Sequence, residues 1–221
     1  MKPTPLLFAG IFASFAAAWL GLIVASETQI GGLQPNVNEE EGDVYPINVA
    51  GLTERGRQVY IANGCNTCHT QFVRDDYMTD DIARQWGPRR TDPLDYIYTD
   101  AAVIGINRVG PDLSNIGAEQ AEDSPRRYLQ DAQWHYRHLY NPRSIVEDSV
   151  MPSYRFLFET RKIVGQRSDY AVNLTGADAP RYGYEVVPTE DARALVAYLL
   201  SLDKSHPLKK PEAAAAAAPA N

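Results

Sequence analysis

The chain of 221 residues is poor in cysteine, with two residues, Cys65 and Cys68, three positions apart. A disulfide framework cannot be built from them, so they form a redox pair, part of a metal site, or attachment points for a cofactor. Basic charge is also scarce, with 21 Lys and Arg against 28 Asp and Glu, and a net charge of −7. Nucleic-acid binding is therefore not expected, because phosphate recognition needs a basic surface.

The sequence also lacks a constellation of side chains typical of an enzyme. The acidic pairs Asp75-Asp76 and Asp80-Asp81 are adjacent along the chain rather than facing each other, which is typical of a solvated loop. No internal repeat is visible. We therefore expect no catalytic site in this chain itself.

Long apolar runs are absent except at the N-terminus, where Leu6 to Ser26 is almost uninterrupted hydrophobic sequence. At about 1.5 Å per residue this run would form a helix of about 30 Å, which is enough to cross a bilayer core. Val24-Ala25-Ser26 also resembles a cleavage site, so a signal peptide is the alternative. Lys2 precedes the run and Glu27 follows it, which predicts a single-pass anchor in a bacterial cytoplasmic membrane with the domain on its periplasmic face.

The rest of the chain divides by composition. After the anchor (1–26), residues 27–50 contain glycine, proline and an acidic run, and we expect a flexible linker. Residues 51–206 are expected to form one domain. The alanine-rich tail, 207–221, is of low complexity and is expected to be disordered.

The domain is predicted to be all-α. Thr53 is a candidate N-cap for a helix through Asn63, and Gly56 within it suggests that another backbone packs closely there. Thr189 to Asp203 is predicted to be a helix capped by Thr189, with leucines at helical spacing. Between them lies a loop-rich stretch with short helices expected at 124–140 and 141–148. Weak strand signals occur at 102–106 and 184–187.

The strongest motif is Cys65-Asn66-Thr67-Cys68-His69. This C-x-x-C-H pattern places two thiols to meet the vinyl groups of a haem and a histidine to bind its iron, so one covalent haem c is predicted. A thioredoxin-like redox pair would need a βαβ pattern, which is absent from the sequence. A zinc site would need more ligands, and His135 and His138 are closer together than is usual for a zinc finger. A structural disulfide would leave His69 unexplained.

The second axial ligand is expected to be a thioether or an imidazole. Of the three methionines, Met1 precedes the apolar run and Met78 lies in a polar segment close to His69. Met151 is followed by a proline that stiffens its loop, and it is the predicted iron ligand together with His69. His135 or His138 is the alternative.

Gly110-Pro111-Asp112-Leu113 is a further candidate for the cofactor site. A histidine on a metal usually donates its other ring N–H to an oxygen acceptor, which fixes the ring. Pro111 is the candidate for supplying that carbonyl. An ordinary turn is the alternative.

A set of longer motifs supports these assignments. They are Gly56-Arg57-Gln58-Val59-Tyr60, Gly64-Cys65, Cys68-His69-Thr70-Gln71, Val73-Arg74, Trp86-Gly87, Arg89-Arg90, Arg108 to Leu113, His138-Leu139, Asn141-Pro142-Arg143-Ser144, Ser149 to Tyr154 and Leu195 to Leu202. Over roughly residues 5 to 203 the chain resembles the mono-haem c subunit (subunit II, CcoO/FixO) of cbb3-type cytochrome c oxidases. The Pro-Arg-Ser and Met-Pro-x-Tyr block is the most specific part. Asp75 to Asn107 and the tail beyond Ser205 depart from the pattern.

The resemblance implies an all-α cytochrome c fold whose first and last helices cross. It also implies an electron-relay subunit that passes electrons from a soluble or membrane cytochrome c to an oxygen-reducing haem–copper subunit. The other subunits of that terminal oxidase would be its partners. A free-standing, membrane-anchored cytochrome c that shuttles electrons between respiratory complexes is the alternative. Arg74, Arg89 and Arg90 are candidates to pair with haem propionates.

Overall fold

The computed structural model describes residues 3–38, 42–119 and 126–208. The chain divides into two compact units. The first comprises Met1–Ile47, Asp92–Asp100 and Leu208–Asn221, and the second comprises Asn48–Thr91 and Ala101–Pro207. The tail expected to be disordered lies outside the described residues from residue 209 onward, as do Lys2, the glutamates at 39–41 and the start of the helix expected at 124.

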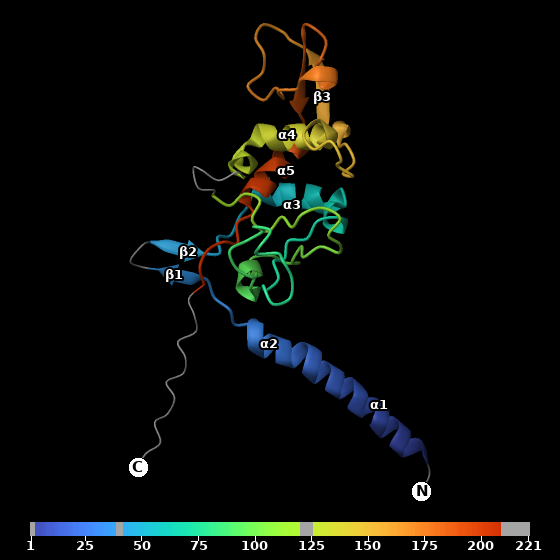
Figure 1. Cartoon of the computed structure of the whole chain (residues 1–221). Helices are drawn as coiled ribbons and strands as arrows, with labels where there is room; N and C mark the ends of the chain where they lie inside the picture. The colour runs from blue at the N-terminus through green and yellow to red at the C-terminus, as the bar shows by residue number, and fades with distance from the viewer. Residues whose placement is uncertain (1–2, 39–41, 120–125, 209–221) are drawn as a thin grey trace. The chain divides into compact units, whose positions relative to one another are not determined.

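The first unit contains a long apolar helix. It comprises α1 (Pro3–Trp19), a π-helical turn η1 (Leu20–Val24) and α2 (Ala25–Ile30) (Figure 1). The span Thr4–Ile30 has 27 residues and is long and apolar enough to cross a membrane. The helix continues past Ser26, where the apolar run of the sequence ends.

The first unit also contains a small hairpin. Strands β1 (Asn36–Asn38) and β2 (Asp43–Tyr45) pair antiparallel. The Tyr45 hydroxyl donates a hydrogen bond of 2.7 Å to Oδ1 of Asp95 in the 3-10 helix η3 (Pro93–Tyr96). Part of the range 27–50, which was expected to be a flexible linker, therefore has regular structure.

The second unit is built on a pair of crossing helices. Helix α3 (Leu52–Ala62) packs against α5 (Glu190–Ser201) (Figure 1). A Cβ added at Gly56 would lie 1.9 Å from the carbonyl oxygen of Ala194, so the close backbone approach expected at Gly56 is confirmed. Thr189 caps α5 as predicted, because its Oγ1 accepts from the amide of Ala192 at 3.2 Å.

The predicted start of α3 was wrong by two residues. Gly51, with φ of 65°, is the N-cap, and Thr53 lies inside the first turn. A glycine adopts this left-handed conformation without the steric cost that a side chain brings, so the chain can turn sharply into the helix there.

A third helix completes the core. Helix α4 (Ala132–Tyr140) is capped by Asp131, and Figure 1 shows α5 between α3 and α4. Short 3-10 turns flank it, namely η4 (Arg127–Gln130), η5 (Pro142–Ser144) and η6 (Arg155–Leu157). The largest fully buried side chains of this core are those of Tyr60, Val172, Leu195 and Val196.

A second hairpin extends from the core. Strand β3 (Phe158–Lys162) pairs antiparallel with β4 (Tyr184–Pro188), and η7 (Gly176–Asp178) lies in the loop between them. The strand signal at 184–187 is thus confirmed. Residues 102–106, where a strand was also expected, do not form one. The amide of Gln71 donates to the carbonyl of Ile104, and the amide of Ile106 donates to the carbonyl of Asn66. Helices α3, α4 and α5 supply most of the core, and Phe158 of β3 and Val186 of β4 add to it.

Candidate functional site

The C-x-x-C-H motif lies on a tight turn directly after α3. Gly64 adopts a left-handed conformation with φ of 67° and leads into the 3-10 helix η2 (Cys65–Thr67). The amide of His69 donates to the carbonyl of Cys65 at 3.0 Å, which closes the turn. Both cysteines are free thiols and half-buried. The turn thereby presents two thiols and one imidazole to the same cavity.

That cavity has a volume of about 730 Å³ and lies within the second unit. Cofactor pockets commonly fall between about 300 and 1,000 Å³ and are largely apolar. All five residues predicted as the cofactor site line it, namely Cys65, Cys68, His69, Pro111 and Met151. The fold thus brings together residues that are up to 86 positions apart (65 to 151). The donor set fits a haem held by thioether bonds and two axial ligands.

The His69 ring is fixed by its neighbours. Its Nδ1 lies 2.8 Å from the carbonyl oxygen of Pro111, and because a carbonyl can only accept, Nδ1 carries the proton. Nε2 is then left with a lone pair for a metal. Burial lowers the pKa of His69, and the Pro111 carbonyl partly opposes this, so the neutral imidazole that binds metals is favoured.

Gly110 belongs to a motif that the sequence indicated for the cofactor site, but no role was predicted for the glycine itself. A Cβ at this position would lie 2.3 Å from Cε1 of His69, so the ring occupies the space that a side chain would need. The signal in the sequence was the glycine directly before Pro111. Its role follows only from the contact between two segments 41 positions apart (69 to 110).

The Met151 loop is anchored to α4. The amide of Tyr154 donates to the carbonyl of Leu139 at 2.8 Å, and the Met151 amide donates to Oγ of Ser149 at 3.3 Å. Met151 is half-buried and lines the cavity. Met78 is 61% exposed and does not line it, so Met151 is the methionine available to this cavity.

The two alternative histidine ligands differ in availability. Nε2 of His135 lies 2.7 Å from the carbonyl of Leu129. His138 stacks on Trp134 with ring centroids 4.8 Å apart, and its buried Nδ1 has no hydrogen-bond partner among the described residues. Burial lowers the pKa of His138 to about 4, and nearby His135 and His69 add to the effect. His138 is therefore a neutral imidazole at the cavity wall.

The non-haem alternatives receive no support from the geometry. Strands in the described ranges pair only as two antiparallel hairpins, which is not the βαβ setting of a thioredoxin-like pair. Burial raises the pKa of Cys65 to about 11, whereas redox-active cysteines have lowered values. Across residues 3–38, 42–119 and 126–208, no three His, Cys, Asp or Glu side chains gather as a zinc site would require.

The arginines proposed from sequence to bind propionates lie elsewhere. Arg74 pairs with Asp81 at 3.3 Å, Arg89 donates to the carbonyl of His206 at 2.7 Å, and Arg90 lies 3.8 Å from Asp75. None of the three lines the cavity. The arginines that do line it are Arg84 and Arg126. Neither of these two arginines was among the candidates that the sequence suggested for the propionates.

Asp81 lies in the loop that follows the motif and pairs with both Arg74 and Arg108. Its side chain is 2% exposed. Burial alone would raise its pKa, but hydrogen bonds from Arg108 and Arg74 outweigh burial and hold the pKa well below its usual range. Because the folded-state pKa is lowered, this carboxylate stabilises the fold above its unfolded pKa of about 3.9, and the stabilisation is lost as the pH falls.

Asp81→Asn is expected to lower the free energy of unfolding by about 3 kcal/mol at pH 7, because Arg74 and Arg108 lose the buried carboxylate with which they pair. The difference from the unchanged protein should shrink as the pH falls from about 5 towards 3. Urea unfolding followed by tryptophan fluorescence at several pH values measures both effects. Asp80→Asn, at the exposed neighbouring position, is the matched control and should change little. Equal losses in both variants would contradict the assignment.

The crossed helices, the C-x-x-C-H turn and the apolar cavity define an all-α, cytochrome c-like domain. The family model described as "Cytochrome C oxidase, mono-heme subunit/FixO" matches residues 36–181. The chain therefore belongs to the FixO family of mono-haem subunits of cytochrome c oxidase, and the resemblance seen in the sequence is confirmed. No curated protein matches the chain. Family membership implies one haem and association with other oxidase subunits.

Proposed function

We propose that this chain is the electron-relay subunit of a cbb3-type cytochrome c oxidase and carries one covalent haem c. The observation that carries the proposal is the single cavity lined by both thiols, His69 and Met151. A free-standing cytochrome shuttle is less well supported, because the family is one of oxidase subunits. The contribution of the chain would be to hold a redox centre and to dock on the other subunits.

Different residues would bind the porphyrin and the iron of the cofactor. Cys65 and Cys68 would form thioether bonds, while Nε2 of His69 and the sulfur of Met151 would serve as axial ligands. When bound, a haem iron accepts and releases one electron at a time. His69 is kept neutral and oriented by the Pro111 carbonyl, and Gly110 leaves room for its ring. The largely apolar walls of the cavity would surround the metal ligands.

Arg84 and Arg126 are the proposed partners of the haem carboxylates. Both line the cavity, and a guanidinium can bind a carboxylate through two parallel hydrogen bonds. Arg84 also lies over the ring of Trp86, with 5.4 Å from its Cζ to the ring centroid. This proposal replaces Arg74, Arg89 and Arg90 in that role.

The apolar helix Thr4–Ile30 is the proposed membrane anchor. The haem domain would then lie on the periplasmic face of a bacterial cytoplasmic membrane, where it could receive electrons from a soluble or membrane cytochrome c. The acidic balance of the chain, with a net charge of −7, suits attraction of a basic donor protein. The oxygen-reducing haem–copper subunit would be the acceptor.

An alkaline pyridine haemochrome spectrum of the denatured protein tests the proposal. The protein should be purified from membranes of a host that matures c-type cytochromes. One haem per chain, retained after denaturation, together with co-purifying oxidase subunits, is the expected result. A chain without retained haem would overturn the proposal, and a haem-loaded chain purified without any oxidase subunit would favour the shuttle.

Met151→Leu is expected to keep the covalent haem but to lose low-spin His/Met ligation, because a leucine has no sulfur to offer the iron. Optical spectra of the oxidised protein, with the weak near-infrared sulfur-to-iron band, report this change. Met78→Leu is the matched control, since Met78 is exposed and does not line the cavity. An unchanged His/Met spectrum in Met151→Leu would remove Met151 from the site, and a spectrum with two nitrogen ligands would point to His138.

A further inference from the structure

Asp112 is a buried carboxylate directly beside the carbonyl that holds His69. Its side chain is 0% exposed. Oδ2 accepts hydrogen bonds from Oγ1 of Thr70 at 2.6 Å and from the amide of Phe72 at 2.8 Å, and Oδ1 accepts from the amide of Ser114 at 2.8 Å. One carboxylate thus joins the segment after the motif to the turn that contains Pro111.

Backbone bonds join the same two segments on either side of His69. The amide of Gly110 donates to the carbonyl of Cys68 at 3.0 Å, and the amide of Leu113 donates to the carbonyl of Thr70 at 2.8 Å. The contact between Nδ1 of His69 and the carbonyl of Pro111 lies between these two. Residues 68–72 and 110–114 therefore hold the imidazole from both sides. Asp112 is the charged side chain within this pair of segments, and its Oδ2 lies 3.8 Å from Nη2 of Arg108.

Arg108 orients the hydroxyl group of Thr70, which bridges Arg108 and Asp112. Its Nε donates to Oγ1 of Thr70 at 3.0 Å, so the single hydroxyl proton of Thr70 is directed at Asp112. Arg108 also donates to the carbonyl of Phe72 and to Asp81, and its Cζ lies 5.3 Å from the ring centroid of Trp86 at the cavity wall. The bonds around Asp112 are therefore directional and satisfied, which favours one fixed arrangement.

We propose that Asp112 is a positioning residue for His69 that, through Thr70 and the Pro111 turn, fixes the ring and sets the reduction potential of the iron it binds. The inference rests on the proposed function. Groups that hydrogen-bond to a ligating histidine without touching the metal fix the orientation of the imidazole and raise its basicity. A negative charge behind the ligand also stabilises the more positive, oxidised iron, so it lowers the potential.

The test is a redox titration of haem-loaded Asp112→Asn. Removing the negative charge should raise the potential by an amount that shifts the oxidation equilibrium about tenfold, or about 59 mV for one electron. The asparagine amide also cannot accept from Thr70, Phe72 and Ser114 together, since its nitrogen is a donor. The ferric EPR g-values, which report ring orientation, should therefore change as well.

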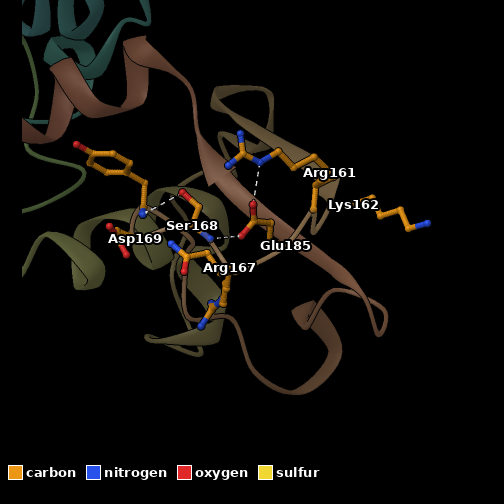
Figure 2. A pocket seen from close by; sticks show the side chains of 9 residues that line it. Arg161, Lys162, Arg167, Ser168, Asp169 and Glu185 are labelled. Atoms are coloured by element: carbon orange, nitrogen blue, oxygen red, sulfur yellow. Dashed lines mark hydrogen bonds and ion pairs between the residues drawn. The ribbon is translucent and has the colours of Figure 1, made fainter.

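Glu185→Gln is the matched control. Glu185 is 3% exposed, lies on β4 and accepts 2.8 Å hydrogen bonds from the amide of Ser168 and from Nε of Arg161, as Figure 2 shows. It does not line the cofactor cavity. Both variants remove a buried, bonded carboxylate and should unfold more easily. Only Asp112→Asn should shift the potential and the g-values, which a purely structural role would leave unmoved.

Equal potentials in Asp112→Asn and the unchanged protein, or an equal shift in Glu185→Gln, would overturn the inference. If Asp112→Asn does not load haem, Thr70→Val removes only the hydroxyl bridge. Its g-values should then change, and unchanged values would overturn the inference. A wild-type chain that retains no haem would instead overturn the proposed function.

Discussion

A chain carrying both Cys65→Ser and Cys68→Ser is expected to release all of its haem on denaturation, whereas the unchanged chain is expected to retain one haem. The two thiols lie on one turn at the cavity, and they are the only cysteines in the sequence. Serine preserves the size of the side chain, but its hydroxyl cannot replace the thiol in the thioether bond. No other residue of the chain can supply that bond. The measurement is haem-stained electrophoresis under denaturing conditions.

Asn66→Ala provides the control for these two substitutions. Asn66 lies between the cysteines, but it does not line the cavity, so its variant should retain the haem. Single cysteine variants should each keep one attachment and show a haemochrome band shifted to longer wavelength. Retention of the haem in the double variant would mean that the chain holds it in another way, and the c-type assignment would be lost.

Gly56→Leu is expected to prevent stable folding of the second unit, or to lower its free energy of unfolding by more than about 3 kcal/mol. Even a Cβ at Gly56 would lie 1.9 Å from the carbonyl oxygen of Ala194 and 2.6 Å from Cβ of Tyr198. Neither atom belongs to the flexible end of a side chain, so α3 and α5 would have to separate. Thermal unfolding of the detergent-purified chain, followed by circular dichroism, measures the loss.

Gly32→Leu tests whether the loss is specific to the helix contact. Nothing lies within 4 Å of a Cβ at Gly32, and its backbone conformation suits other residues. This variant should unfold at nearly the temperature of the unchanged chain. A stable Gly56→Leu chain would contradict the crossing of α3 and α5 described above.

The local features of this chain could be predicted from the sequence, and the contacts between distant segments could not. The C-x-x-C-H spacing lies on one turn, so the placement of Cys65, Cys68 and His69 together followed directly. Gly56 was also informative, because a glycine inside a helix has a cost that close packing offsets. The direction in which each arginine points depends on tertiary packing, which explains why Arg84 and Arg126 were missed.

The same limit applies to the elements that differ from expectation. Residues 102–106 have strand-forming composition, but their bonds go to the irregular segment 66–71 and not to a partner strand. Asp112 is one acidic residue among 28 in the sequence, and its three hydrogen bonds become apparent only when 70–72 meets 112–114. Its burial could not be read from its neighbours along the chain.

The contact between α3 and α5 joins residues near 56 to residues near 194, so it has a consequence for the order of folding. Contacts between distant parts of a chain form late and slowly, because a long loop must first be closed. The core cannot be completed until the chain has been synthesised through Ser201. Cys65 and Cys68 therefore spend the period before that in an open chain, where an enzyme that attaches the proposed haem could reach both thiols before the cavity walls close around them.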